Sequence, residues 1–225
     1  MNKKKHFITI SVFIFALLTC LIDAIIKPNY FIKIPIKVIF FFALPTIFFL
    51  RNKKDFEDFK KLFKFKKDGL LKALFLGLLI YIIIIFTYFI TKNIIDYSNV
   101  TKSLTTGMQI TKFNFIYAAT YIALINSFLE EFFFRGYGFI TLKRYSNRRY
   151  AYLSSSIAFA SYHIGMLLEM FNIYVLIFLL ISLIFGGCLF NYLNEKNNNI
   201  YSSWFVHMFT NFAINSIGLI LFGIV

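Results

Sequence analysis

Charged residues are scarce in this 225-residue chain, at 15% of the sequence, while 59% of its residues are hydrophobic. Soluble proteins carry about a quarter charged residues, so a soluble globular domain is excluded. Glycine and proline are also few, at 10 and 3, which excludes a collagen-like chain. The two cysteines, Cys20 and Cys188, lie inside apolar runs and do not provide a disulfide scaffold. The composition predicts an all-α, polytopic transmembrane helical bundle.

Apolar runs of about 17 to 25 residues are long enough to cross the hydrocarbon core of a membrane. Seven such runs lie at 8–26, 34–50, 70–91, 113–134, 151–169, 173–193 and 202–224. The first run extends to Ile26 and favours an uncleaved span over a signal peptide. We expect residues 1–225 to form a single integral membrane domain. Its amino-terminal spans occupy 1–110, and the polar motifs described below fall within 111–225.

Basic residues lie between the apolar runs, where they act as topology signals. For this reason the net charge of +14 does not predict a nucleic-acid partner. One side of the predicted membrane carries 17 Lys and Arg residues and the other carries six. This asymmetry predicts a multi-pass protein of the cell membrane, with its amino terminus and the 51–69 and 135–150 loops in the cytoplasm. The segment 51–69 spaces four phenylalanines among lysines, which fits either an amphipathic helix on anionic membrane lipid or a solvated loop.

Ionisable groups inside apolar runs cost about 2.5 to 3.5 kcal/mol at mid-bilayer and by default indicate function. Asp23 and Glu169 lie near span ends, where we expect them to be hydrated. Glu130 and Glu131 occupy the predicted cytoplasmic end of the fourth span and point about 100° apart on a helix. Glu131 precedes Arg135 by four residues, the favourable order for an ion pair, which leaves Glu130 for general-base chemistry. Alternatively, both acids pair with Arg135 and anchor the helix end.

Two of the three histidines also fall within predicted spans, whereas His6 lies in the basic amino-terminal tail. His163 follows Phe159 by four residues, and Asn211 follows His207 by four, so each pair shares one face of a helix. Polar groups in lipid seek one another or a water-filled cavity. We therefore expect the two histidines and Asn211 to converge with Glu130.

Three short motifs contain these residues: EEFFFRG, FASYH and HMFTN, in that order along the chain. Together they resemble the E-E-x-x-x-R, F-x-x-x-H and H-x-x-x-N motifs of the CAAX protease and bacteriocin-processing (CPBP) family of intramembrane endopeptidases. That family includes the eukaryotic Ras-converting prenyl endopeptidases. The resemblance implies an active site within the membrane that opens toward the cytosol. Its members often have eight spans, so 92–112 is a candidate for an eighth span or a re-entrant segment.

The resemblance also implies roles for individual residues. Glu130 activates a water molecule with the help of His163, while His207 and Asn211 stabilise the tetrahedral oxyanion. Glu131 and Arg135 form a structural ion pair, and Phe159 belongs to the second motif. No cofactor is required in this scheme. Zinc remains an alternative, and its ligands would be Glu130, His163 and His207.

The function predicted from these motifs is hydrolysis of a peptide bond in a membrane-associated peptide or protein substrate. A non-enzymatic membrane scaffold, or a bacteriocin self-immunity protein that keeps the fold, is the alternative. A cation-coupled transporter that uses Glu130 and His163 as a proton relay is a third hypothesis. The sequence shows no internal repeat of the kind common in transporters, which disfavours it.

Overall fold

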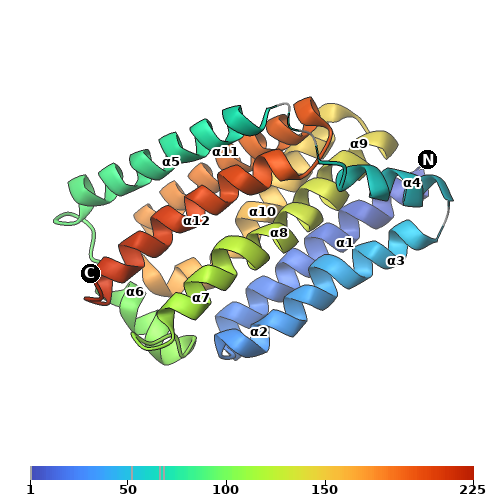
Figure 1. Cartoon of the computed structure of the whole chain (residues 1–225). Coiled ribbons are helices and arrows are strands. Elements are labelled where there is room, and N and C mark those ends of the chain that lie inside the picture. The colour runs from blue at the N-terminus through green and yellow to red at the C-terminus, as the bar shows by residue number, and fades with distance from the viewer. Residues whose placement is uncertain (1, 52, 66, 68) are drawn as a thin grey trace.

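Every regular element in the described part of the chain is a helix, and the long helices lie side by side as a bundle (Figure 1). A computed structural model describes residues 2–51, 53–65, 67 and 69–225. The predicted all-α fold class is confirmed. The uninterrupted α-helices of twenty or more residues are α1 (Asn2–Leu21), α5 (Leu70–Thr91), α10 (Arg148–Met170), α11 (Ile173–Asn197) and α12 (Tyr201–Leu221).

Several helices include π-helical stretches, in which each backbone hydrogen bond spans five residues instead of four. The π-helical η1 (Ile22–Ile26) extends α1. A second helix consists of α2 (Tyr30–Lys37), η2 (Val38–Ala43) and α3 (Leu44–Leu50). A third runs without interruption from residue 115 to 145. Its parts are α7 (Phe115–Tyr121), η4 (Ile122–Asn126), α8 (Ser127–Glu130), η5 (Glu131–Thr141) and α9 (Leu142–Tyr145).

Five helices among the described residues are long and apolar enough to cross a membrane: Lys3–Ile26, Tyr30–Leu50, Leu70–Thr91, Ile173–Asn197 and Tyr201–Leu221. These five correspond to predicted spans one, two, three, six and seven. The other two predicted spans fall on the helix of residues 115–145 and on α10. Both carry several buried polar side chains, which lower their apolarity. A polytopic bundle agrees with the prediction.

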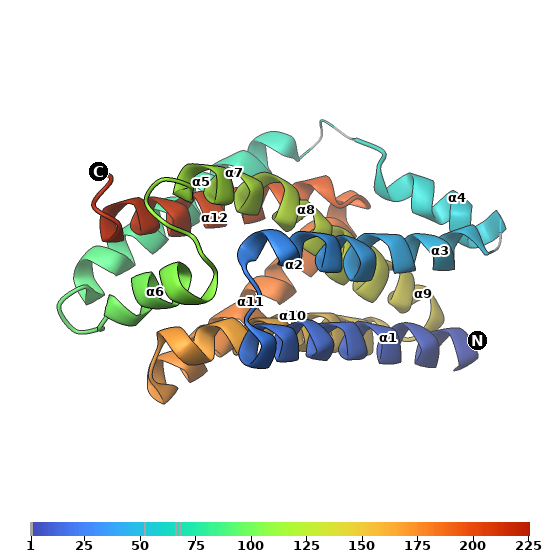
Figure 2. The ribbon, with the colours of Figure 1, turned by 90° about the horizontal axis from the view of Figure 1, so that it is seen from below.

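Different elements and different polar contacts lie at the two ends of the bundle. At one end lie the amino terminus, α4 (Lys53–Leu62) and α9, and at the other lie α6 (Ser98–Lys102) and the carboxyl terminus (Figure 2). Lys4 Nζ donates to the buried Asp55 at 2.6 Å at the first end. Lys112 Nζ donates to the Gly223 carbonyl oxygen at 2.7 Å at the second. The basic segments on which the topology prediction depends lie at the first end.

Aromatic side chains of η2, η5 and α10 pack together in the core of the bundle. Phe41 stacks on Phe133 with ring centroids 4.4 Å apart, and Phe134 meets Phe159 edge to face at 5.4 Å. Three consecutive phenylalanines of η5, residues 132–134, are fully buried. Edge-to-face and offset pairs of this kind contribute more than their area alone. They fix the helix that carries both glutamates against its neighbours.

Close helix contacts elsewhere depend on glycine. A Cβ atom added to Gly165 of α10 would overlap the carbonyl oxygen of Cys20 in α1. A Cβ on Gly187 of α11 would lie 3.0 Å from Ser156 Cβ. Small residues at helix crossings allow backbones to approach closely, as is common in membranes. A Cβ on Gly186, by contrast, would meet no atom of the described residues within 4 Å.

The structure corrects the predicted end of the fourth span and the loop that follows it. The helix does not stop near residue 134 but continues to Tyr145, so Glu130 and Glu131 lie well inside it. Only Ser146 and Asn147 separate this helix from α10, which leaves little of the predicted 135–150 loop. Arg135 is fully buried, and it does not belong among the loop residues that indicate topology.

Asp23 is also placed differently from the prediction. Its side chain is 8% exposed and lies 2.8 Å from Lys33 Nζ, so the expectation that it is hydrated is wrong. Lys33 and Lys37, which count among the six basic residues of the less basic side, lie one turn apart within α2, and both are buried. Glu169, at the other predicted span end, is 32% exposed and pairs with Lys27.

Two further segments refine the predictions. Residues 92–112 contain only the short α6 and the π-helical η3 (Ser103–Gly107), which is too short for an eighth span. Within 51–69, Phe59 of α4 and Phe63, which directly follows α4, contact Phe132 with ring centroids 5.9 and 5.8 Å away. These two rings of the amphipathic segment thus pack on the protein. Asn52, Lys66 and Asp68 of that segment lie outside the described residues.

Candidate active site

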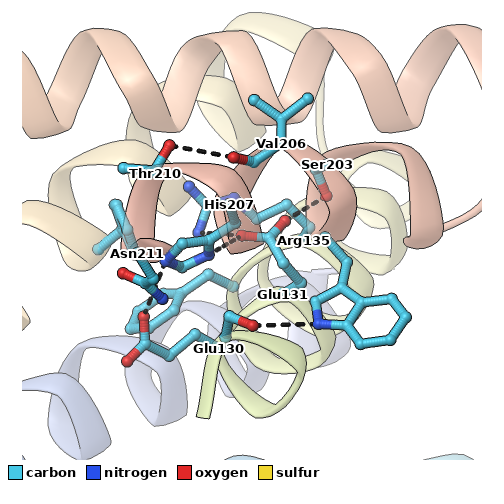
Figure 3. A network of polar contacts seen from close by, with 12 residues as sticks. Glu130, Glu131, Arg135, Ser203, Val206, His207, Thr210 and Asn211 are labelled. Atoms are coloured by element: carbon cyan, nitrogen blue, oxygen red, sulfur yellow. Dashed lines mark hydrogen bonds and ion pairs between the residues drawn. The ribbon is translucent and has the colours of Figure 1, made fainter. Parts of the chain in front are cut away.

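Three helices bring the predicted site residues to the middle of the bundle. Glu130 ends α8 and Glu131 begins η5, so both come from the helix of residues 115–145. His163 comes from α10, and His207 comes from α12 together with Asn211. Figure 3 shows the two glutamates on different sides of the His207 ring, as expected for successive helical residues.

The two oxygens of the Glu130 carboxylate have different surroundings. Oε1 accepts hydrogen bonds from Asn126 Nδ2 at 2.6 Å and from the Tyr162 hydroxyl at 2.9 Å. Oε2 lies 3.7 Å from His207 Nε2, which is too long for a hydrogen bond. The residue is 2% exposed. One oxygen is therefore fixed by donors, while the other faces the imidazole.

Glu131 holds the opposite side of the same imidazole. Its Oε1 lies 3.0 Å from His207 Nδ1, and its Oε2 accepts a hydrogen bond from the Ser203 hydroxyl (Figure 3). A carboxylate oxygen can only accept, so Nδ1 carries the hydrogen. Phe190 stacks on the ring with centroids 5.2 Å apart. These contacts fix the orientation of His207 and leave Nε2 directed at Glu130.

Arg135 lies 3.5 Å from Glu131 Oε1 through Nη1, with both side chains fully buried. None of its three guanidinium nitrogens has a hydrogen-bond partner within the described residues. The guanidinium instead contacts aromatic rings, because its carbon lies 4.1 Å from the Phe159 ring centroid and 5.0 Å from that of Phe190. Cation–π contacts of this kind are strongest when desolvated. Phe159 of the second motif thus contacts the arginine of the first.

His163 is half-buried and directs its ring into the site. Its Nδ1 lies 2.7 Å from the carbonyl oxygen of Phe159, so Nδ1 donates and a neutral ring keeps a lone pair on Nε2. The ring lines a cavity of about 40 Å³ together with Lys37, Tyr30 and Tyr162. The Glu130 carboxylate is near enough for a Coulombic interaction with this imidazole.

Asn211 follows His207 by one turn of α12 and is 9% exposed. Its Nδ2 donates to the carbonyl oxygen of Ile122 at 3.2 Å. An amide nitrogen has two hydrogens, and the second is left for another acceptor. The structure thus places Glu130 against His207, with His163 and Asn211 nearby. The catalytic roles assigned to these residues stay predictions.

Three further residues contact the site: Lys37 and Asn126, which lie outside the motifs, and Tyr162, which occupies a variable position of FASYH. Lys37 Nζ donates to Asn126 Oδ1 at 2.9 Å and lies 3.9 Å from Glu130 Oε1. Asn126 precedes Glu130 by four residues, so helical spacing could have indicated it. Tyr162 directly precedes His163, and adjacent helical residues point in different directions, so spacing gives no signal for it. Lys37 comes from a distant helix, and only its position inside an apolar run marks it.

The donor set fits a bound zinc ion poorly. Within the described residues, no group of three or more His, Cys, Asp and Glu side chains is arranged to hold a metal ion. The ammonium of Lys37 already faces Glu130 at 3.9 Å, so a second cation there would be repelled. The arrangement instead offers one carboxylate oxygen and two imidazoles to a neutral molecule such as water.

A family model of known proteins matches part of the chain. Residues 112–213 match the family model of the Type II CAAX prenyl endopeptidase Rce1-like proteins. The matched range contains all three motifs and confirms the resemblance to the CPBP family. No curated protein and no solved structure matched the chain. The family match and the five long apolar helices indicate a membrane protein.

Proposed function

We propose that this protein is an intramembrane endopeptidase that hydrolyses a peptide bond in a membrane-associated peptide or protein. The family match supports a peptidase, and hence a hydrolase. The observation that carries the proposal is the Glu130 carboxylate, held through Oε1 while Oε2 faces His207 Nε2 at 3.7 Å. A water molecule beside this gap can reach both groups, and no resident cofactor is part of the proposal.

Glu130 is the general base of the proposed reaction. It takes a proton from the water, and the water oxygen bonds to the carbonyl carbon of the substrate. The neutral Nε2 of His163 can accept a hydrogen bond from the same water and orient it. The proton then passes from Glu130 to the amide nitrogen as the carbon–nitrogen bond breaks. The products are a carboxylic acid and an amine, and the enzyme returns to its starting state.

His207 and Asn211 are the proposed donors to the oxyanion. His207 already donates from Nδ1 to Glu131, so donation from Nε2 requires a ring protonated on both nitrogens. Asn211 supplies the hydrogen that is not used by Ile122. Glu131 and Arg135 act on this arrangement through packing and orientation.

The proposal is tested by comparing the peptides of membranes from cells that express the wild type or Glu130→Ala. Glu57→Ala is a matched control, because Glu57 is 62% exposed in α4 and pairs only with Lys60 among the contacts described. We expect at least one product that requires Glu130 and persists with Glu57→Ala. Identical peptide sets for all three proteins would refute the proposal and favour a scaffold or a self-immunity protein.

We further propose that the protein lies in the cell membrane with its amino terminus in the cytoplasm. The support is the gathering of the basic loops at the end of the bundle that holds the amino terminus, α4 and α9.

A further inference from the structure

Lys37 is a buried cation that the motif residues do not require. It ends α2 and is 8% exposed. Its ammonium lies 5.0 Å from the Tyr162 ring centroid, in addition to its contacts with Asn126 and Glu130. Lysine inside an apolar span is costly and is rarely placed there without a partner. These three contacts therefore define what the lysine can do in the site.

A chain of hydrogen bonds connects this cation to one oxygen of Glu130. Lys37 donates to Asn126 Oδ1 at 2.9 Å, and Asn126 Nδ2 donates to Glu130 Oε1 at 2.6 Å. The first bond fixes which way the Asn126 amide points, because only its oxygen can accept from an ammonium. The amide nitrogen is thereby aimed at Oε1. Rotation of the carboxylate is restricted, and Oε2 remains on the His207 side.

The charge of Lys37 also acts on Glu130 directly, across 3.9 Å of apolar interior. A carboxylate buried without a cation takes up a proton, and a nearby cation keeps it ionised. A protonated carboxyl group cannot serve as the base in the first step of the proposed reaction.

Other polar groups face Glu130 from each neighbouring helix. Tyr162 and His163 do so from α10, and His207 does so from α12. Asn126 and Glu131 belong to its own helix, with Arg135 beyond Glu131. Lys37 is the cation that α2 places beside the carboxylate, with Nζ 3.9 Å from Oε1. We propose that Lys37 is a positioning residue, which keeps Glu130 ionised and, through Asn126, turns its Oε2 toward the substrate.

This inference rests on the role proposed for Glu130, but its test requires no substrate. The probe is the infrared carbonyl stretch of a protonated carboxyl group in the purified, detergent-solubilised protein. The band of Glu130 is identified by its loss in Glu130→Gln. We expect no such band in the wild type at pH 7 and a clear band in Lys37→Met. Adding Glu130→Gln to Lys37→Met should remove that band.

Lys33→Met is the matched control, since Lys33 is another buried lysine one turn away and pairs with Asp23 instead. It should leave Glu130 ionised. A folded Lys37→Met protein without the band would overturn the inference, and so would a Glu130 band in the wild type at pH 7. The second result needs no lysine variant, so it decides the matter even if Lys37→Met does not fold.

Once a peptide product is known, cleavage adds a further readout. We expect Lys37→Met to lose about tenfold or more of its rate at pH 7, which corresponds to one unit of displacement in a pH profile, and to recover as the pH is raised. A loss that is equal at every pH would indicate a merely structural role and overturn the inference. If Glu130→Ala leaves the peptides unchanged while the infrared result holds, the proposed function fails and the charge assignment stands.

Discussion

Replacing each of the two adjacent glutamates by glutamine should have opposite consequences. Glu131→Gln removes the negative charge that faces Arg135 at 3.5 Å in a fully buried setting. A guanidinium cannot lose its proton in a protein, and breaking one half of a buried pair costs about 3 to 5 kcal/mol. The variant also weakens the hydrogen bonds that Glu131 accepts from His207 Nδ1 and from the Ser203 hydroxyl. We therefore expect Glu131→Gln to lose most of its folded protein.

Glu130→Gln should be milder, because the glutamine oxygen can still accept from Asn126 and Tyr162. Lys37 keeps its hydrogen bond to Asn126, and an ammonium, unlike a guanidinium, can release its proton when it is buried. The expected loss of stability is about 1 kcal/mol, the scale of one hydrogen bond. Cleavage should be abolished, since an amide is not a base.

Thermal unfolding in detergent, followed for the wild type and both variants, measures the first effect, and cleavage of a peptide identified in the membranes measures the second. The melting temperature should fall much further for Glu131→Gln than for Glu130→Gln. If Glu131→Gln proves stable and inactive while Glu130→Gln remains active, the roles are reversed and Glu131 is the catalytic base. Equal melting temperatures would refute the assignment of the buried ion pair as a stabilising contact.

Three further predictions concern other parts of the bundle. Lys60→Cys, in a protein without its native cysteines, should react with a membrane-impermeant thiol reagent only after cells are opened, and labelling of intact cells would overturn the proposed topology. Gly165→Ala should destabilise the protein by about 1 to 3 kcal/mol and lower its melting temperature, because the added methyl group would overlap the backbone of Cys20 in α1. Gly186→Ala is the control and should change the melting temperature little, because its methyl group would meet no described atom within 4 Å. Ser203→Ala should destabilise the protein by about 1 to 3 kcal/mol, because it leaves a buried oxygen of Glu131 without its donor, and a melting temperature equal to that of the wild type would contradict this.

The fold class could be predicted because its signal is strong and local. Runs such as 70–91 are apolar throughout, and α5 occupies the same residues, Leu70–Thr91. The end of the fourth span could not be predicted. EEFFFRG carries three charged residues, a pattern typical of the point where a helix leaves the membrane. Arg135 stays buried there, supported by Glu131 and two phenylalanine rings, and the two rings come from other helices.

Proximity within the site follows from helical spacing only when both residues share one helix. The pairs Glu131 with Arg135 and His207 with Asn211 could be anticipated in this way. The contact of Glu131 with His207 joins residues 76 apart in the chain, and the contact of Lys37 with Asn126 joins residues 89 apart. No local pattern specifies which lysine of an apolar span directs its side chain into the bundle. A topology prediction counts Lys37 only as a positive charge and takes no account of where its side chain points.

The small cavity beside His163 and Lys37 has a consequence for how a substrate arrives. About 40 Å³ is room for a water molecule, which occupies about 30 Å³ in the liquid, but not for a peptide. Glu130 and His207 are 2% and 5% exposed, so a scissile bond can reach them only when helices separate. Turnover would then follow the rate of this opening, on the microsecond to millisecond scale of helix movements. Because hydrophobic mismatch acts on tilted and separating helices, cleavage by the proposed peptidase should then also depend on bilayer thickness.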